Sequence, residues 1–481
     1  MKHPRFIRPL SLNERLYAAG ETLAPPFALT YVLEGDGFLE DAAFQAAVAQ
    51  VIEAMPALTF GRKAGRWVSN QQAPTIRCVA TPLPDDWDAP CFAEGLGSGV
   101  ADFQLYAGKT MVVRVLHRLM DAKGVQTVLR LLFAALRGEA LQVEEAFPAD
   151  VQLRAQIAAV DRPSRGGYAF RWPSLRLANS APASYQTRVY HLGQRWDAPL
   201  AKIAALISKH LKAPCRFLIP VDLRRHQGVP PAAANLSLPI YLEVQPGQSW
   251  QEVQAQLLAL LQQKGELAPE PFESLASRLP ISWLRGLMKV AIGKVNRSHR
   301  FPMSGFLSDN GFVDLTTYQT PRFQVQQVVA LPVFVPLAPI GLVAIHHQGG
   351  TNVAVQVPAT EEANHLLSVL QEAIDEEEVP KVAAKEEEVR LEPWLLPIAE
   401  MWGRYLQKEP SSIAPTAHFS DLGGDSLQLL AMLSEMSSVY VPEESAAFMQ
   451  AVLDTGGRIH LQSLGELIQQ YSDQAFTKSD R

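Results

Sequence analysis

The sequence predicts an α/β region in two lobes, followed by a small all-α domain of four helices. Up to about residue 375, segments that alternate as strands are interleaved with segments of helical periodicity, whereas helical periodicity alone remains after residue 391. A run of charged residues with almost no large apolar side chains separates the two regions. The 481 residues are also too many for one compact core, and we expect about three folding units.

The first lobe is expected over residues 1–165. FALTYVLEG alternates as a strand does, and the following FLEDAAFQAAVAQVIEAM carries apolar residues at helical spacing. Further along, MVVRVLHRLMDAKG is expected to be a buried strand that leaves for a turn, and VQTVLRLLFAAL a helix. His117 and Asp121 therefore lie at a strand end and its turn, where catalytic groups are often displayed.

The second lobe is expected over residues 182–375, after a segment at 166–181 that is rich in Arg, Pro, Gly and Ser. LAKIAALISKHLK is predicted to be a helix, CRFLIPVDLRR a strand and SWQEVQAQLLALLQQK a helix. Residues 305–357 are predicted to be mostly β, with turns at Asp309-Asn310-Gly311 and Gly349-Gly350. The helix EEANHLLSVLQEAI closes this lobe.

A charged linker is expected at residues 376–391, because EEEVPKVAAKEEEVR is typical of a solvated chain. The domain after it, residues 392–478, is then free to swing while it stays tethered. Its sequence reads as a helix (PWLLPIAEMWGRYLQ), a loop, a helix that begins near Ser426, and a last helix (SLGELIQQYS).

Ser426 begins a helix whose apolar residues, among them Leu433 and Met436, fall on one face. Asp425 can cap the N-terminus of this helix, and Gly423-Gly424 permits the tight turn before it. The Ser426 hydroxyl is then exposed at the positive end of the helix dipole, where a phosphodiester is favourably placed.

The run DLGGDSL resembles the attachment motif of peptidyl and acyl carrier proteins, and the flanking helices agree with that family over about 90 residues. The resemblance implies that 4'-phosphopantetheine is attached covalently to Ser426 by a phosphopantetheinyl transferase. The thiol of this arm would hold an acyl or aminoacyl thioester.

Four segments of the larger region, in order, resemble the condensation domains of nonribosomal peptide synthetases, which belong to the chloramphenicol-acetyltransferase superfamily. They are PLSLNERLY, FALTYVLEGDGFLEDAAFQAAVAQVIEAMPAL, IPVDLRRHQGVPPAAANLSLPIYLEV and FLSDNGFVDL. The resemblance implies the two-lobed α/β fold of that superfamily, with a tunnel between the lobes.

The central motif of that family is HHxxxDG, and the corresponding run here is LHRLMDA, which keeps His117 and Asp121. By resemblance, His117 takes a proton from the attacking amine or alcohol, or orients it and stabilises the charged transition state. Asp121 is implied to be structural, through an arginine salt bridge. Its customary partner is replaced by Leu58-Thr59-Phe60, so Arg15 or Arg224 is the expected substitute.

Three further features have a structural interpretation, and for Asn310 a functional interpretation stays open beside it. Asn310 is either a turn former or a group that faces the tunnel. The pair His346-His347 lacks the following aspartate and is expected in a β-hairpin. Asp222, Arg224 and Arg225 are expected to stabilise the second lobe.

These resemblances imply a condensing acyltransferase of a nonribosomal peptide or hybrid polyketide pathway, which joins a carrier-bound acyl thioester to an amine or hydroxyl nucleophile. One substrate would hang from Ser426, and an upstream donor carrier protein would bring the other. Since no adenylation segment is found, an adenylation or loading enzyme is expected to act in trans. The alternatives are a docking platform that has lost catalysis, which Leu116, Ala122 and Thr59 favour, and an O-acyltransferase whose acyl donor is bound to Ser426.

Composition limits the partners and the compartment. The net charge of -6 is spread along the chain without a basic stripe, which argues against nucleic acid. Three cysteines without metal-ligand spacing predict no metal site and fit a reducing, cytoplasmic setting. The uncharged stretch Val325 to Ile345 contains three prolines, so buried strands are expected there and no membrane segment.

Overall fold

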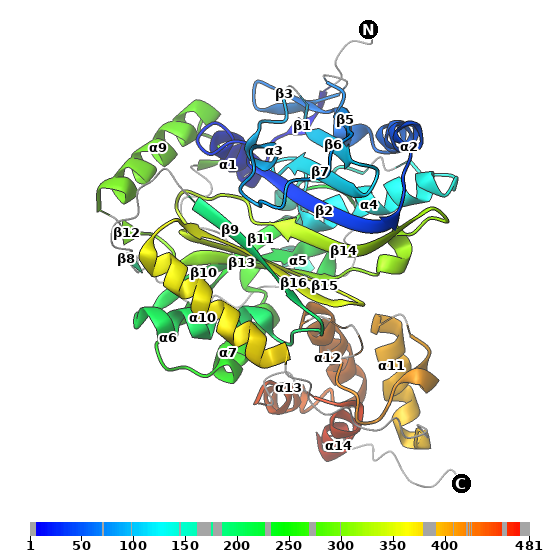
Figure 1. Ribbon diagram of the computed structural model, residues 1–481. Helices are drawn as coiled ribbons and strands as arrows, with labels where there is room; N and C mark the ends of the chain where they lie inside the picture. Colours follow the sequence, from blue (N-terminus) through cyan, green and yellow to red (C-terminus); the bar gives the residue numbers. More distant parts are fainter. Residues whose placement is uncertain are drawn as a thin grey trace.

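Two α/β lobes lie side by side, and a small helical domain lies beside them (Figure 1). The computed structural model describes residues 6–69, 72–97, 99–143, 146–160, 175–176, 185–226, 232–268, 276–298, 300–378, 391–406, 408–419, 422, 424, 426–454 and 459–471. The strands and helices predicted above occur in this order, together with elements that were not predicted from the sequence.

The N-terminal lobe is built on a five-stranded sheet in the order β14-β2-β7-β6-β5. The strands are Ala28–Gly37 (β2), Thr75–Val79 (β5), Ala101–Tyr106 (β6), Thr110–Leu116 (β7) and Phe323–Leu331 (β14). Helices α2 (Asp41–Ala54) and α4 (Ala122–Leu136) pack their apolar faces on this sheet and form the core of the lobe. β7, which leads to His117, is buried at every position after Thr110 because it lies inside the sheet.

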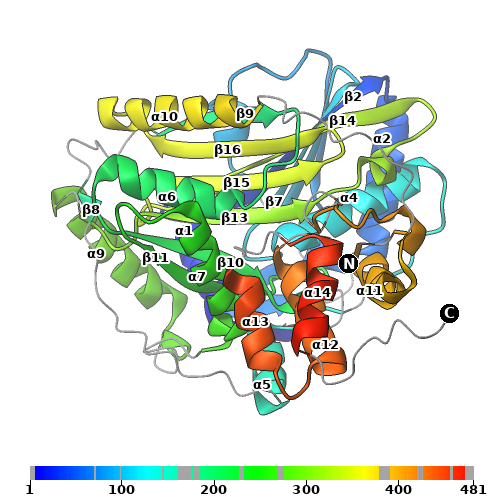
Figure 2. The ribbon, with the colours of Figure 1, turned by 90° about the horizontal axis from the view of Figure 1, so that it is seen from below.

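The C-terminal lobe is built on a six-stranded sheet in the order β11-β10-β13-β15-β16-β9. The strands are Tyr185–Leu192 (β9), Cys215–Asp222 (β10), Ser237–Val244 (β11), Gly305–Phe312 (β13), Ile340–His347 (β15) and Gly350–Pro358 (β16). Helices α6 (Pro199–Leu211), α7 (Trp250–Gln262) and α10 (Glu361–Glu378) cover one face of it (Figure 2).

Shorter elements complete the two lobes. The remaining strands are Phe6–Pro9 (β1), Gly61–Lys63 (β3), Arg66–Val68 (β4), Leu175–Arg176 (β8) and Arg300–Phe301 (β12). The remaining helices are Leu12–Gly20 (α1), Pro90–Ala93 (α3), Asp150–Val160 (α5) and Ile281–Ser298 (α9), with 3-10 turns at Pro56–Thr59 (η1), Leu223–Arg225 (η2), Gly265–Leu267 (η3) and Leu315–Tyr318 (η4). α9 packs against α1, so the two halves of the chain also meet at this edge.

The expected boundary between the lobes, with residues 182–375 forming the second one, is wrong for one strand. β14 leaves the C-terminal half of the chain and pairs antiparallel with β2, from Leu331 opposite Thr30 to Phe323 opposite Gly37. Apolar β14 side chains pack into the core of the N-terminal lobe. This burial explains why β14 joins the sheet of that lobe although it comes from the C-terminal half of the chain. Of the expected divider at 166–181, only β8 lies within the described residues.

The predicted turn at Asp309-Asn310-Gly311 is also wrong, because β13 continues through all three residues. The register against β15 shifts between Asp309 and Phe312, which marks a bulge, and Gly311 has a φ of +73°. A bulge needs the conformational freedom of glycine as a turn does, so the local sequence signal is the same. The second predicted turn is confirmed, since β15 and β16 form a hairpin at Gly349-Gly350.

The described residues of the small C-terminal domain form four main helices, as predicted. They are Leu396–Leu406 (α11), Ser426–Tyr440 (α12), Ser445–Asp454 (α13) and Leu461–Tyr471 (α14), with short turns at Pro393–Leu395 (η5) and Pro410–Ser412 (η6). Trp402 and Phe419 meet edge to face in its core, with ring centroids 5.3 Å apart. α10 runs to Glu378, three residues into the expected linker, and residues 379–390 lie outside the described part of the chain.

Among the helices in the described ranges, none combines the length and the apolar character needed to cross a bilayer. The uncharged stretch from Val325 to Ile345 forms most of β14, a connection, and the first part of β15, as predicted.

Candidate active site

His117 follows directly after β7, where the strand ends in a turn. Its backbone N–H donates to the carbonyl of Phe27 at 3.1 Å, and its own carbonyl accepts from the Asn235 side-chain amide at 2.7 Å. The imidazole stacks on the Tyr17 ring with centroids 4.4 Å apart and planes tilted by 25°. Contacts from both lobes therefore fix the backbone of His117, and Tyr17 of the N-terminal lobe fixes its ring.

A cavity of about 420 Å³ lies between the lobes, and His117 is part of its wall. Most of its lining is apolar and comes from α1, α7, α9 and the strands of both sheets, including Leu16, Leu29, Val221, Leu257, Met288 and Phe306. A volume of this size is typical of sites for small organic ligands. The cavity is therefore suited to a small, largely apolar ligand that reaches His117.

Burial is the largest influence on His117 and lowers the pKa of its imidazole below the ordinary value of 6.5. The charge of Asp121 opposes this shift without overcoming it. Within the described residues, Nδ1 of His117 is buried and has no hydrogen-bond partner. The imidazole is therefore neutral near pH 7 and is able to accept a proton.

The Asp121 carboxylate has all its hydrogen bonds away from the His117 ring. Oδ1 accepts from the backbone N–H of Gly124 at 3.0 Å and so caps α4. Oδ2 accepts from Arg224 Nη1 at 2.9 Å and from the Leu236 N–H at 2.7 Å, and the Ser237 hydroxyl lies 3.3 Å away. Asp121 is thus a clamp that joins the turn after β7 to the other lobe.

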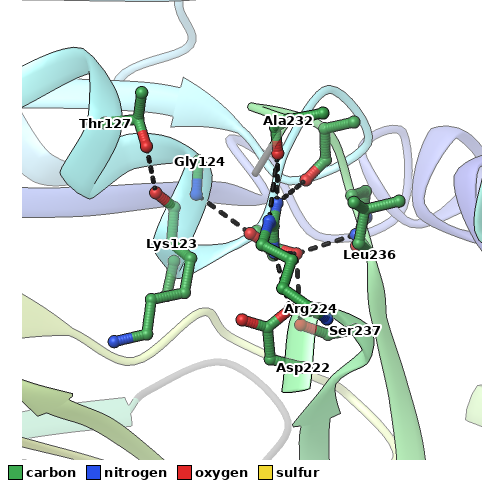
Figure 3. Close-up of polar contacts among 12 residues, drawn as sticks. Lys123, Gly124, Thr127, Asp222, Arg224, Ala232, Leu236 and Ser237 are labelled. Atoms are coloured by element: carbon green, nitrogen blue, oxygen red, sulfur yellow. Dashed lines mark hydrogen bonds and ion pairs between the residues drawn. The ribbon is translucent and has the colours of Figure 1, made fainter. Parts of the chain in front are cut away.

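The pKa of Asp121 is lowered although burial acts to raise it, because the Arg224 charge and the hydrogen bonds outweigh burial. Arg224 lies in η2 and also bonds Asp222 at 2.7 Å and the carbonyls of Ala232 and Ala234 at 2.6 and 3.0 Å. Figure 3 shows its guanidinium among Asp222, Ala232 and Ser237.

Of the two arginines considered as partners of Asp121, Arg224 is therefore the one that binds it. Arg15 instead donates to the carbonyl of Leu279. Arg225 faces away and pairs with Glu266 at 2.5 Å, in keeping with a stabilising role in its lobe.

The altered positions of the LHRLMDA run fit the structure without distortion. Ala122 is the first residue of α4, with Asp121 as N-cap, so a glycine is not required there. The close approach occurs two residues later, where a Cβ on Gly124 would lie 2.7 Å from Cβ of Met120. Leu116 ends β7 opposite Ala28 and is buried.

Asn310 faces the space between the lobes and lines the cavity, which decides between its two interpretations. Its Nδ2 donates to the Tyr31 hydroxyl at 2.9 Å, and its carbonyl accepts from Lys123 at 3.2 Å and Gln126 at 3.0 Å. The bulge of β13 is thereby tied to the N-terminal lobe. His346, expected in a hairpin, lies there at the end of β15, and its Nε2 is 3.4 Å from Asp309.

α12 begins at Ser426, as predicted. A Cβ on Gly424 would lie 2.0 Å from the Phe419 ring, so this position requires glycine. The chain thus passes close over the domain core before the N-terminus of α12, where the dipole favours a phosphodiester. Asp425 and Gly423 lie outside the described residues.

Three residues of this region were not predicted from the sequence. Tyr17 reaches His117 from α1, Asn235 from the loop before β11, and Tyr31 reaches Asn310 from β2. The asparagine lies in the Asn-bearing loop of the condensation-domain resemblance, so that signal was present. The two tyrosines are ordinary members of amphipathic segments, and no local pattern sets them apart.

Comparison with known proteins gives findings for both parts of the chain. Residues 397–450 match the family described as phosphopantetheine attachment site. Among proteins with curated functions, no relative of the sequence is found.

Solved structures with a similar fold cover the larger region. Polyketide synthase associated protein 5 from Mycobacterium tuberculosis has a TM-score of 0.53 at 14% identity, covering 79% of this chain and 100% of that chain. The starter condensation domain of rhizomide synthetase RzmA has a TM-score of 0.50 at 16% identity, covering 77% and 94%. The condensation domain of the Monacolin K polyketide synthase MokA has a TM-score of 0.50 at 11% identity, covering 77% and 96%.

The large region therefore has the two-lobed fold of condensation domains, which confirms the predicted fold class. The region after it is a phosphopantetheine-binding carrier domain, which confirms 4'-phosphopantetheine as the covalent cofactor.

Proposed function

We propose that this chain is a condensing acyltransferase of a nonribosomal peptide or hybrid polyketide pathway. It joins a carrier-bound acyl thioester to an amine or hydroxyl nucleophile, and one of the two substrates is attached to Ser426. The observation that carries the proposal is the position of His117 at the wall of an apolar cavity, in a chain that also has a carrier domain.

His117 is the base of the proposed reaction. The nucleophile loses its proton to the neutral imidazole as it attacks the thioester carbonyl, and a new C–N or C–O bond forms while the C–S bond breaks. The proton then passes from the imidazolium to the departing thiolate, so that the histidine is neutral again. Tyr17 and the hydrogen bond from Asn235 hold the ring and its backbone in place during both transfers.

Asp121, Arg224 and Asn310 hold this geometry in place. They do not act as acids or bases in the reaction. The Asp121 carboxylate already accepts from Gly124, Arg224 and Leu236 and has no hydrogen bond to the His117 ring. Its role is to hold the turn that presents His117. An intact clamp of this kind favours a working catalyst over a decayed docking platform.

The carrier domain holds the cofactor at Ser426, and phosphopantetheine supplies there a thiol that binds an acyl or aminoacyl group as a thioester. A phosphopantetheinyl transferase is needed to attach it. We propose that an upstream carrier brings the second substrate, that an adenylation or loading enzyme acts in trans, and that the reaction takes place in the cytoplasm.

Intact-mass analysis of the phosphopantetheinylated protein tests the proposal. The protein is charged on Ser426 with an aminoacyl group and mixed with an acylated upstream carrier, and the species on each carrier is weighed. A mass gain on Ser426 equal to the acyl group supports the condensation. If an acyl group on Ser426 is instead lost to free alcohols, the chain is an O-acyltransferase with its donor in cis. No transfer in either direction leaves the docking platform as the answer.

A further inference from the structure

The carrier domain is packed directly on the C-terminal lobe. Its helices α12 and α13 contact α7, and α12 also contacts η2, which holds Arg224. Buried side chains of the carrier, among them Met432 and Met436, belong to one continuous apolar cluster with Val253 and Leu257 of α7. Figures 1 and 2 both place the carrier helices beside α7. The carrier domain therefore has one defined docking position, or seat, on the C-terminal lobe.

Arg195 lies at the contact between the carrier and the lobe, in the connection between β9 and α6. Its guanidinium is half-buried and donates a hydrogen bond to the carbonyl of Gly424, two residues before Ser426. On the other side, the Arg195 Cζ atom lies 6.0 Å from the centroid of the Phe312 ring, at the end of β13. Arg195 thus bridges the attachment end of the carrier and the edge of the central strand.

The residues of β13 just before Phe312 line the cavity. Asp309, three residues before Phe312, lines the cavity and is close enough to Arg195 to feel its charge. Ala198, three residues after Arg195, lines it as well. Arg195 therefore links the chain just before α12 to the strand whose bulge forms part of the cavity wall.

We propose that Arg195 seats the chain's own carrier and binds the phosphate of its arm, so that the arm enters the cavity along the β13 bulge. A guanidinium is the side chain best suited to this task, because its planar set of donors matches phosphate oxygens. The N-terminus of α12 adds backbone donors to the same phosphate. This inference rests on the proposed function, because it assumes that Ser426 carries one of the reacting groups.

Three variants of the full, phosphopantetheinylated chain test the seat. Arg195→Glu reverses the charge, Arg195→Lys keeps it without the planar fork, and Arg188→Glu makes the same reversal on an exposed residue of the neighbouring strand β9. The turnover rate with an acyl group on Ser426 is divided by the turnover rate with the same acyl group on free pantetheine. Because free pantetheine needs no carrier domain, this ratio isolates the contribution of the carrier. Hydrogen exchange of α7 measures the seating itself, independently of activity.

For Arg195→Glu we expect the turnover ratio to fall by about tenfold, as the loss of a charge-assisted hydrogen bond implies, and exchange in α7 to rise. Arg195→Lys should lie between this variant and the wild type, and Arg188→Glu should match the wild type. An unchanged ratio together with unchanged exchange in Arg195→Glu overturns the proposal. If the wild type turns over neither thioester, the proposed function has failed and the exchange data alone decide whether Arg195 seats the carrier.

Discussion

Arg224 reaches across the lobes to Asp121, with its Nη1 atom 2.9 Å from Oδ2 of the carboxylate. The two residues are 103 positions apart in the chain, yet this contact holds the turn that presents His117. Asp121 is almost completely buried, so its charge depends on this partner and on the hydrogen bonds beside it.

Replacing Arg224 by alanine is expected to destabilise the chain strongly. The change leaves the Asp121 and Asp222 carboxylates without their shared cation and removes the side-chain donor to the carbonyls of Ala232 and Ala234. Loss of one partner of a buried ion pair costs about 3–5 kcal/mol. Chemical denaturation at neutral pH measures the loss, and a decrease below about 1 kcal/mol would contradict the clamp.

Arg225→Ala is the matched control for this variant. Arg225 is the next residue and also binds a buried carboxylate, Glu266, but its side chain donates to Glu266 and to the Leu261 carbonyl and not to Asp121. We expect it to lose stability while the folded fraction keeps wild-type turnover. Arg224→Ala should lose both stability and turnover per folded molecule.

Tyr17 is expected to act on His117 through its ring and not through its hydroxyl. Burial raises the pKa of the Tyr17 hydroxyl, which therefore stays neutral. Tyr17→Phe keeps the stacked ring and should retain kcat/KM within about threefold, whereas Tyr17→Ala should lower it about tenfold, in line with 0.5–1.5 kcal/mol for an aromatic pair. Equal losses in both variants would assign the role to the hydroxyl.

The dependence of activity on pH follows from the lowered pKa of His117. Its imidazole is neutral above that pKa and acts as a base there, so kcat/KM should be level near neutrality and fall as the pH drops. Because burial moves the pKa below 6.5, the acidic inflection should lie below 6.5. A pH–rate profile measured with a free pantetheine thioester tests this, and an inflection above 6.5 would contradict the assigned environment.

Asp150, at the start of α5, is expected to weaken the fold at neutral pH. Burial raises its pKa from 3.8 to about 6, with a further contribution from the nearby Glu14 carboxylate. The folded chain therefore binds more protons than the unfolded chain between these two values, and stability falls as the pH rises through that interval.

Asp150→Asn removes this charge and keeps an oxygen that can accept from Asn13, which bonds the carboxylate at 2.9 Å. We expect the variant to be more stable by about 1–2 kcal/mol at pH 7.5, and the gain to shrink towards pH 4. Thermal unfolding at the two pH values measures the difference. A gain that is the same at both would show that ionisation is not its cause.

The sequence predicted the elements well where one local signal was sufficient. β2, α2, β7 and α4 lie where period and composition placed them, and α12 begins at Ser426. Prediction failed where the partner of a segment was distant. β14 has the composition of any buried strand, and only its pairing with β2 shows that it belongs to the N-terminal lobe.

The candidate site likewise contains residues that local motifs predict and residues that only contacts between distant segments reveal. His117, Asp121 and Ser426 stand in recognisable motifs, but the choice between Arg15 and Arg224 needed coordinates, because both are basic residues far from Asp121 in the chain. The bulge at Gly311 was mistaken for a turn since both features favour glycine with positive φ. Tyr17 and Arg195 become functional candidates only through contacts across the fold.

The most direct test of the central claim is a single-turnover reaction followed by intact mass, with wild type, His117→Ala and the surface control His210→Ala, all phosphopantetheinylated and charged on Ser426. We predict that His117→Ala slows the transfer by about 10²–10⁴-fold while its Ser426 remains charged, and that His210→Ala transfers at the wild-type rate. Transfer by His117→Ala at the wild-type rate would contradict the account.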